Sequence, residues 1–84
     1  MSPPECNFTI GDGEGGSKIK VGSTDTREQC VALVHSSFNN VNGVTYSNDG
    51  NTECFAQVEA NGTDHNPLWQ SCISYGKFLL ILNT

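Results

Sequence analysis

The residues of this sequence with the most distinctive chemistry are Cys6, Cys30, Cys54 and Cys72. Structural zinc sites usually take cysteines in pairs separated by about two to four residues. Neighbouring cysteines here lie 24, 24 and 18 positions apart, so no such pair exists. An even number of cysteines in a short chain is instead typical of disulfides formed in an oxidising compartment. We therefore expect two disulfides, for which the spacing alone leaves three pairings open.

The only histidines, His35 and His65, are the other candidates for catalysis. A catalytic base needs a partner that orients it, and neither histidine has an evident one in the sequence. His35 fits the surface of a helix and His65 fits a polar loop. If all four cysteines are bridged, no thiolate nucleophile remains. We predict that the protein is not an enzyme and uses no cofactor.

Two acidic stretches offer the oxygen ligands that calcium prefers: one has Asp12 and Glu14, and the other has Asp49, Asn51 and Glu53. Neither stretch has the spacing of a known calcium loop, and neither supplies the six or so oxygens that the ion requires. Turn formation explains both stretches equally well. We predict no metal site.

The composition restricts the class of protein and its partners. A chain of 84 residues fits one domain, which we expect to span residues 1–84 with a core over about 6–75. The formal net charge is −5, and the four basic residues form no dense stripe, which argues against nucleic acid as a partner. The longest apolar run, Phe78 to Leu82, is far shorter than the ~20 residues of a membrane span. We expect a soluble protein with no membrane insertion.

Two sequons, at Asn7 and Asn61, agree with a secreted glycoprotein. Met1 to Pro4 has neither the basic start nor the apolar run of a signal peptide, so we interpret the chain as a mature segment behind an added methionine. The predicted localisation is secreted or extracellular.

The pattern of apolar residues predicts several strands and one helix. Thr26 and Gln29 form a capping-box pattern, after which Cys30 and Val34 share one face of a helix that ends near Phe38. Asp49-Gly50 predicts a tight reversal between two strands. Loops are expected over the glycine-rich residues 11–16 and over residues 61–67. The predicted strands cover residues 6–10, 17–21, 44–46, 54–58 and 69–75.

Four blocks follow one another along the chain: Glu28-Gln29-Cys30-Val31, Asn42-Gly43-Val44-Thr45-Tyr46-Ser47, Glu53-Cys54-Phe55-Ala56 and Trp69-Gln70-Ser71-Cys72-Ile73. This ordered set resembles the PAN/apple domains that are common in invertebrate extracellular proteins. The resemblance runs from Cys6 to about Ile73. Six-cysteine members carry a further bridge from the position of Val34, so this chain is similar to the four-cysteine variant.

The resemblance implies an α+β fold in which an antiparallel β-sheet curls around a single α-helix. It also implies disulfides from Cys30 to Cys54 and from Cys6 to Cys72. An argument from the helix face favours the same pairing, because Cys30 shares the predicted buried face with Val34 and a strand packed there could offer Cys54.

Aromatic residues, Trp69 among them, are expected mostly in the core of so small a domain. Phe55 is the exception, because if Cys54 faces the helix, alternation turns Phe55 and Gln57 to the opposite face of the sheet. An aromatic ring beside polar groups could there stack on a sugar or anchor a protein contact. We take Phe55, Gln57 and Tyr46 as candidate ligand-binding residues; the alternative is a second small cluster under a loop.

The resemblance implies a non-catalytic recognition or adhesion module that binds other extracellular proteins. One alternative is a lectin-like module that binds carbohydrate, as some PAN/apple domains do, and another is a structural spacer with no ligand of its own. Residues 76–84 are predicted to be an edge strand or a tail. Within them the apolar run from Phe78 to Leu82 predicts weak self-association, because one small domain can scarcely cover both of its faces.

Overall fold

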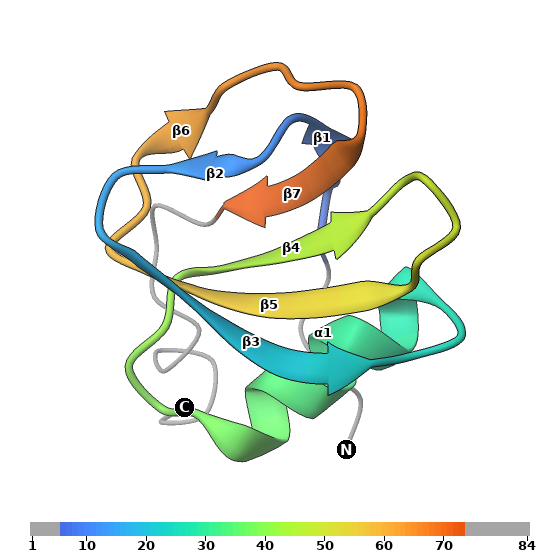
Figure 1. The fold of residues 1–84 in the computed structure, drawn as a ribbon. Coiled ribbons are helices and arrows are strands. Elements are labelled where there is room, and N and C mark those ends of the chain that lie inside the picture. The colour runs from blue at the N-terminus through green and yellow to red at the C-terminus, as the bar shows by residue number, and fades with distance from the viewer. Residues whose placement is uncertain (1–5, 74–84) are drawn as a thin grey trace.

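The structure, a computed structural model, describes residues 6–73, and it is α+β with one helix and two antiparallel sheets. The larger sheet has five strands in the order β1-β7-β4-β5-β3. Figure 1 shows helix α1 on one side of this curled sheet and the two-stranded ribbon of β2 and β6 on the other. The strands are β1 Thr9–Ile10, β2 Gly13–Glu14, β3 Ser17–Ser23, β4 Gly43–Ser47, β5 Glu53–Val58, β6 Gly62–Thr63 and β7 Trp69–Ile73.

Helix α1 spans Arg27–Ser37, as the capping pattern predicts. The Thr26 hydroxyl accepts a hydrogen bond from the backbone N–H of Gln29 at 3.1 Å, and the Gln29 side chain accepts one from the backbone N–H of Thr26. This reciprocal pair satisfies donors that a helix start otherwise leaves free. The helix ends at Phe38, which adopts an extended backbone.

The core lies between α1 and the sheet. Alternation along β4 and β5 directs Val44, Tyr46, Cys54 and Ala56 toward the helix, where they pack with Val34. The Cys30–Cys54 disulfide crosses this layer and joins the helix to β5, with 5.6 Å between its Cα atoms.

The Cys6–Cys72 disulfide ties the segment before β1 to β7, also with 5.6 Å between its Cα atoms. Together with the first bridge it confirms the predicted pairing. No cysteine of the chain is free.

Two predicted loops proved to be partly strand. Gly13–Glu14 pairs antiparallel with Gly62–Thr63, so the glycine-rich segment and the polar segment form a second small sheet. The prediction of a simple loop was wrong because these glycines permit close approach of neighbouring groups as well as turning. A Cβ atom placed on Gly13 would lie 2.5 Å from the Gln57 side chain.

The remaining differences concern strand ends. β1 is shorter than predicted, while β3 continues through Gly22 to Ser23 with a register shift between Lys20 and Gly22. Residues 74–84, which contain the end of the last predicted strand and the apolar run from Phe78 to Leu82, lie outside the described residues. No helix within residues 6–73 is long and apolar enough to cross a membrane.

Reduction of the disulfides should lower the melting temperature sharply. Loop-closure entropy gives about 3.5 kcal/mol for the Cys30–Cys54 loop and about 4.4 kcal/mol for the Cys6–Cys72 loop. These values are comparable to the whole stability of a small domain, about 5–15 kcal/mol. Circular dichroism melts with and without strong reductant measure the difference. An equal melting temperature in both conditions would show that the packed core suffices without the bridges.

Candidate functional site

The sheet face opposite α1 carries a row of buried polar side chains. Thr45 of β4 lies between Gln57 of β5 and Ser71 of β7, and all three are almost completely buried. The hydroxyl oxygens of Thr45 and Ser71 are 2.7 Å apart, and the Gln57 amide donates to Thr45 at 2.6 Å. Ser71 also lies 2.7 Å from the carbonyl oxygen of Gly11, to which its hydroxyl is placed to donate. We call Thr45, Gln57 and Ser71 the polar row.

Strand β2 covers the polar row, which changes how the predicted ligand-binding residues are placed. Gln57 is only 1% exposed, so a ligand reaches its side chain only if β2 moves. Tyr46 faces the helix, where its hydroxyl donates a hydrogen bond to the carbonyl oxygen of Thr24 at 2.6 Å. The structure therefore does not bring Phe55, Gln57 and Tyr46 together on one open surface. Phe55 is the one of the three that is only partly buried.

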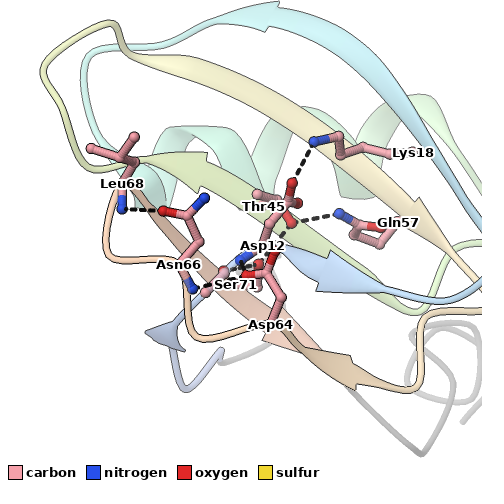
Figure 2. A network of polar contacts seen from close by, with 9 residues as sticks. Asp12, Lys18, Thr45, Gln57, Asp64, Asn66, Leu68 and Ser71 are labelled. Carbon is pink, nitrogen blue, oxygen red and sulfur yellow. Dashed lines mark hydrogen bonds and ion pairs between the residues drawn. The ribbon is translucent and has the colours of Figure 1, made fainter.

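Phe55 is instead grouped with three residues that the sequence analysis did not propose as ligand-binding. Its ring meets Trp69 edge to face, with centroids 5.5 Å apart and planes at 74°. The Lys18 ammonium lies 4.6 Å from the centroid of Phe55 and 4.9 Å from that of Trp69. The same ammonium donates to the Asp12 carboxylate at 2.7 Å (Figure 2). We call Asp12, Lys18, Phe55 and Trp69 the aromatic–cation cluster.

Strand registers explain why Lys18, Phe55 and Trp69 meet. Lys18 is paired with Gln57 and Lys20 with Phe55, so both lysines rise from the same sheet face as Phe55. Trp69 is three positions before Cys72, an odd number that places the two side chains on opposite faces of β7. That spacing is the signal by which Trp69 could have been separated from the core.

The loop between β6 and β7 holds Asp12 in place. One oxygen of Asp64, Oδ1, accepts hydrogen bonds from the backbone N–H groups of Asp12 and Asn66, both at 2.9 Å. The side chain of Asn66 in turn accepts from the backbone N–H of Leu68 at 3.0 Å (Figure 2). Both hydrogen bonds, the one from Asn66 more than the one from Asp12, stabilise the ionised carboxylate of Asp64 and lower its pKa below the usual value.

Neither acidic stretch considered for calcium forms a cluster of ligands. The Asp49 carboxylate accepts hydrogen bonds from Ser47 and Asn51, which close the turn between β4 and β5 and lower the pKa of Asp49. Within residues 6–73 no group of three or more histidine, cysteine or acidic side chains is arranged to hold a metal ion.

The remaining candidates of the sequence analysis lie on different elements. His35 is half-buried on α1, whereas His65 is exposed in the β6–β7 loop at a φ of 65°. The sequon residues Asn7 and Asn61 are both exposed, which is the placement that attachment of a glycan requires.

Comparisons of the chain with protein-family models, with curated proteins and with solved structures found no significant match. The PAN/apple resemblance therefore stays a prediction that rests on the four sequence blocks.

Gly13→Ala should destabilise the domain by about 1–3 kcal/mol, because the new methyl group would overlap the buried and hydrogen-bonded Gln57 amide. Gly62→Ala is the matched control in the partner strand, since its Cβ would meet nothing within 4 Å. That control should change the free energy of unfolding by less than about 0.5 kcal/mol. Chemical denaturation measures both variants. Equal values would show that β2 does not pack closely on the polar row.

The acid stability of the domain should depend on Asp64. Because its pKa is lower in the folded chain than the unfolded value of about 3.9, its contribution is present above that pH and is lost as the pH falls through the folded pKa. Asp64→Asn should therefore flatten the decline in unfolding free energy below about pH 4. Denaturant titrations from neutral to acidic pH measure the slope. Asp25→Asn removes a charge outside this loop and is the control; equal slopes for the two variants would contradict the assignment.

Proposed function

We infer that this chain is a non-catalytic recognition module that binds other proteins through the surface around Phe55 and Trp69. The observation that carries the proposal is the edge-to-face pair of these two rings on the sheet face that does not carry the helix. Both residues are partly exposed, although the core of so small a domain could use them. Aromatic residues, and tryptophan in particular, are enriched among the residues that dominate binding at protein interfaces.

The proposal includes the absence of catalysis. All four cysteines are joined in disulfides, so they supply no thiolate nucleophile. The strongest polar grouping, the polar row, is buried and internally hydrogen-bonded. Such a row supports β2 and the cluster above it instead of meeting a substrate.

A secreted or cell-surface origin and membership of the PAN/apple family belong to the same proposal. Two disulfides in a small domain suit an oxidising compartment. A helix bridged to a central strand of a curled antiparallel sheet, with a second bridge between the two ends of the domain, is the arrangement that the resemblance implies. Adhesion is the role that we expect of such a module.

The position of Lys18 favours a protein over a carbohydrate as the partner. A sugar ring that stacks on Phe55 or Trp69 has to displace the Lys18 ammonium, and a neutral sugar cannot replace that charge beside the Asp12 carboxylate. A protein partner can supply a charged side chain of its own there. Carbohydrate binding is kept as the competing outcome of the experiment.

The experiment compares Phe55→Ala with Ile19→Thr. Ile19 lies on β3 and alternates to the helix side of the sheet, so its variant changes an exposed apolar residue away from the proposed surface. The immobilised domain is used to capture extracellular proteins, and the affinity of each purified partner is then measured directly. We expect Phe55→Ala to weaken binding at least about tenfold, as for a residue that dominates an interface, and Ile19→Thr to leave it unchanged.

A glycan array run with the unmodified domain, Phe55→Ala and Ile19→Thr tests the competing carbohydrate-binding function. Saturable sugar binding that is lost in Phe55→Ala would replace protein recognition by a lectin function. Equal loss of partner binding in both variants would contradict the assignment of the surface. Circular dichroism confirms that each variant remains folded.

A further inference from the structure

We propose that Asp12, Phe55 and Trp69 form a site for a basic side chain of the partner protein, and that Lys18 occupies this site in the free domain. The proposal rests on the protein-binding function and names the chemistry that the surface recognises. Binding exchanges one cation for another: the partner's arginine enters and the Lys18 ammonium leaves for solvent.

The geometry around Lys18 is that of a bound cation. Two aromatic rings at 74° to each other lie within 5 Å of its ammonium, and a carboxylate oxygen lies at 2.7 Å. Aromatic faces attract cations through their quadrupole, and a carboxylate adds a charge-assisted hydrogen bond. The surrounding residues would therefore receive any basic side chain of similar size.

Lys18 is held there in a way that permits exchange. It stands on β3, which is an edge strand of the sheet, and its side chain is 33% exposed. Ion pairs at such exposed positions contribute little to stability, and the flexible lysine stem can turn into water without disturbing the backbone. By contrast, Asp12 is fixed through its backbone by Asp64, while Trp69 lies on the well-paired strand β7.

The carboxylate of Asp12 favours arginine as the incoming group. Its Oδ2 atom accepts from Lys18, while Oδ1 is buried and has no donor among the described residues. A guanidinium group carries several donors in a planar fork, so it can bond both oxygens of a carboxylate and still stack on a ring. An ammonium is a point charge that bonds one oxygen here.

The charge of the chain points the same way. Nine acidic residues against four basic ones give a formal net charge of −5. Lys18, Lys20 and Arg27 are each already paired with a carboxylate. A basic partner is drawn to such a surface, whereas an acidic one is repelled and has to compete with Asp12 for Lys18.

The chain contains one tryptophan, Trp69, so its fluorescence reports directly on this site. The probe is the peptide acetyl-Gly-Arg-Gly-amide, and the control is the same peptide with uncharged citrulline in place of arginine. We expect a saturable change in emission with the arginine peptide and none with citrulline. Asp12→Asn should weaken the response by about tenfold or more, since it removes the charged acceptor.

The Lys18→Ala variant tests the exchange of cations through the direction in which the affinity for the arginine peptide changes. If Lys18 fills the site about 90% of the time, its removal strengthens binding of the arginine peptide about tenfold. Lys20→Ala is the matched control, because it removes the same charge from the same face of β3, where Lys20 is paired with Glu53. That variant should stay within about twofold of the parent protein, since exposed charges are screened.

Weaker or unchanged binding in Lys18→Ala, or an equal gain in Lys20→Ala, would overturn the exchange of cations. A response to citrulline equal to that of arginine would overturn the cation site itself. If partner capture is lost in Phe55→Ala while the arginine peptide gives no signal, the site proposal fails and the protein-binding function stands. If the peptide binds with the expected gain and no partner is captured, the site stands and the function fails.

Discussion

The Cys30–Cys54 disulfide is the constraint on which the arrangement of this domain depends. It attaches the helix to β5 at a position where both half-cystines are completely buried. Once Cys54 faces the helix, the period of a strand leaves no freedom for its neighbours. Ala56 joins the core, and Phe55 and Gln57 turn to the other face. One covalent bond thus decides which side chains of β5 face away from the helix.

The second face of the sheet shows how a small domain carries a site without a second apolar core. Its centre is the polar row, whose members hydrogen-bond to one another and to the backbone of Gly11. The two hydroxyls and the Gln57 amide nitrogen are paired in this way, and paired buried polar groups specify one arrangement more strictly than apolar contacts do. Strand β2 packs closely on the polar row, which fixes its position, and Asp12 directly before β2 therefore lies beside Lys18.

The aromatic–cation cluster lies where four separate segments meet. Lys18 comes from the edge strand β3, Asp12 from the turn before β2, Phe55 from β5 and Trp69 from the start of β7. Asp64, in the loop between β6 and β7, sets the position of Asp12 by hydrogen bonds to the Asp12 backbone. A surface made in this way combines rigid strands with loops, whose sequence can change at little cost to the fold.

Local patterns in the sequence were sufficient for the helix, for the strands β3, β4, β5 and β7, and for the position of Phe55 on the face away from the helix, because caps, alternation and turns act between near neighbours in the chain. Contacts between distant segments were decided only by the tertiary structure. The pairing of β2 with β6 joins residues 13–14 to residues 62–63, which no local period reveals. Gln57 looked like a surface residue in the sequence, but β2 covers it in the structure. Burial is a property of what packs on a residue, and that information is not carried by the residue or its neighbours.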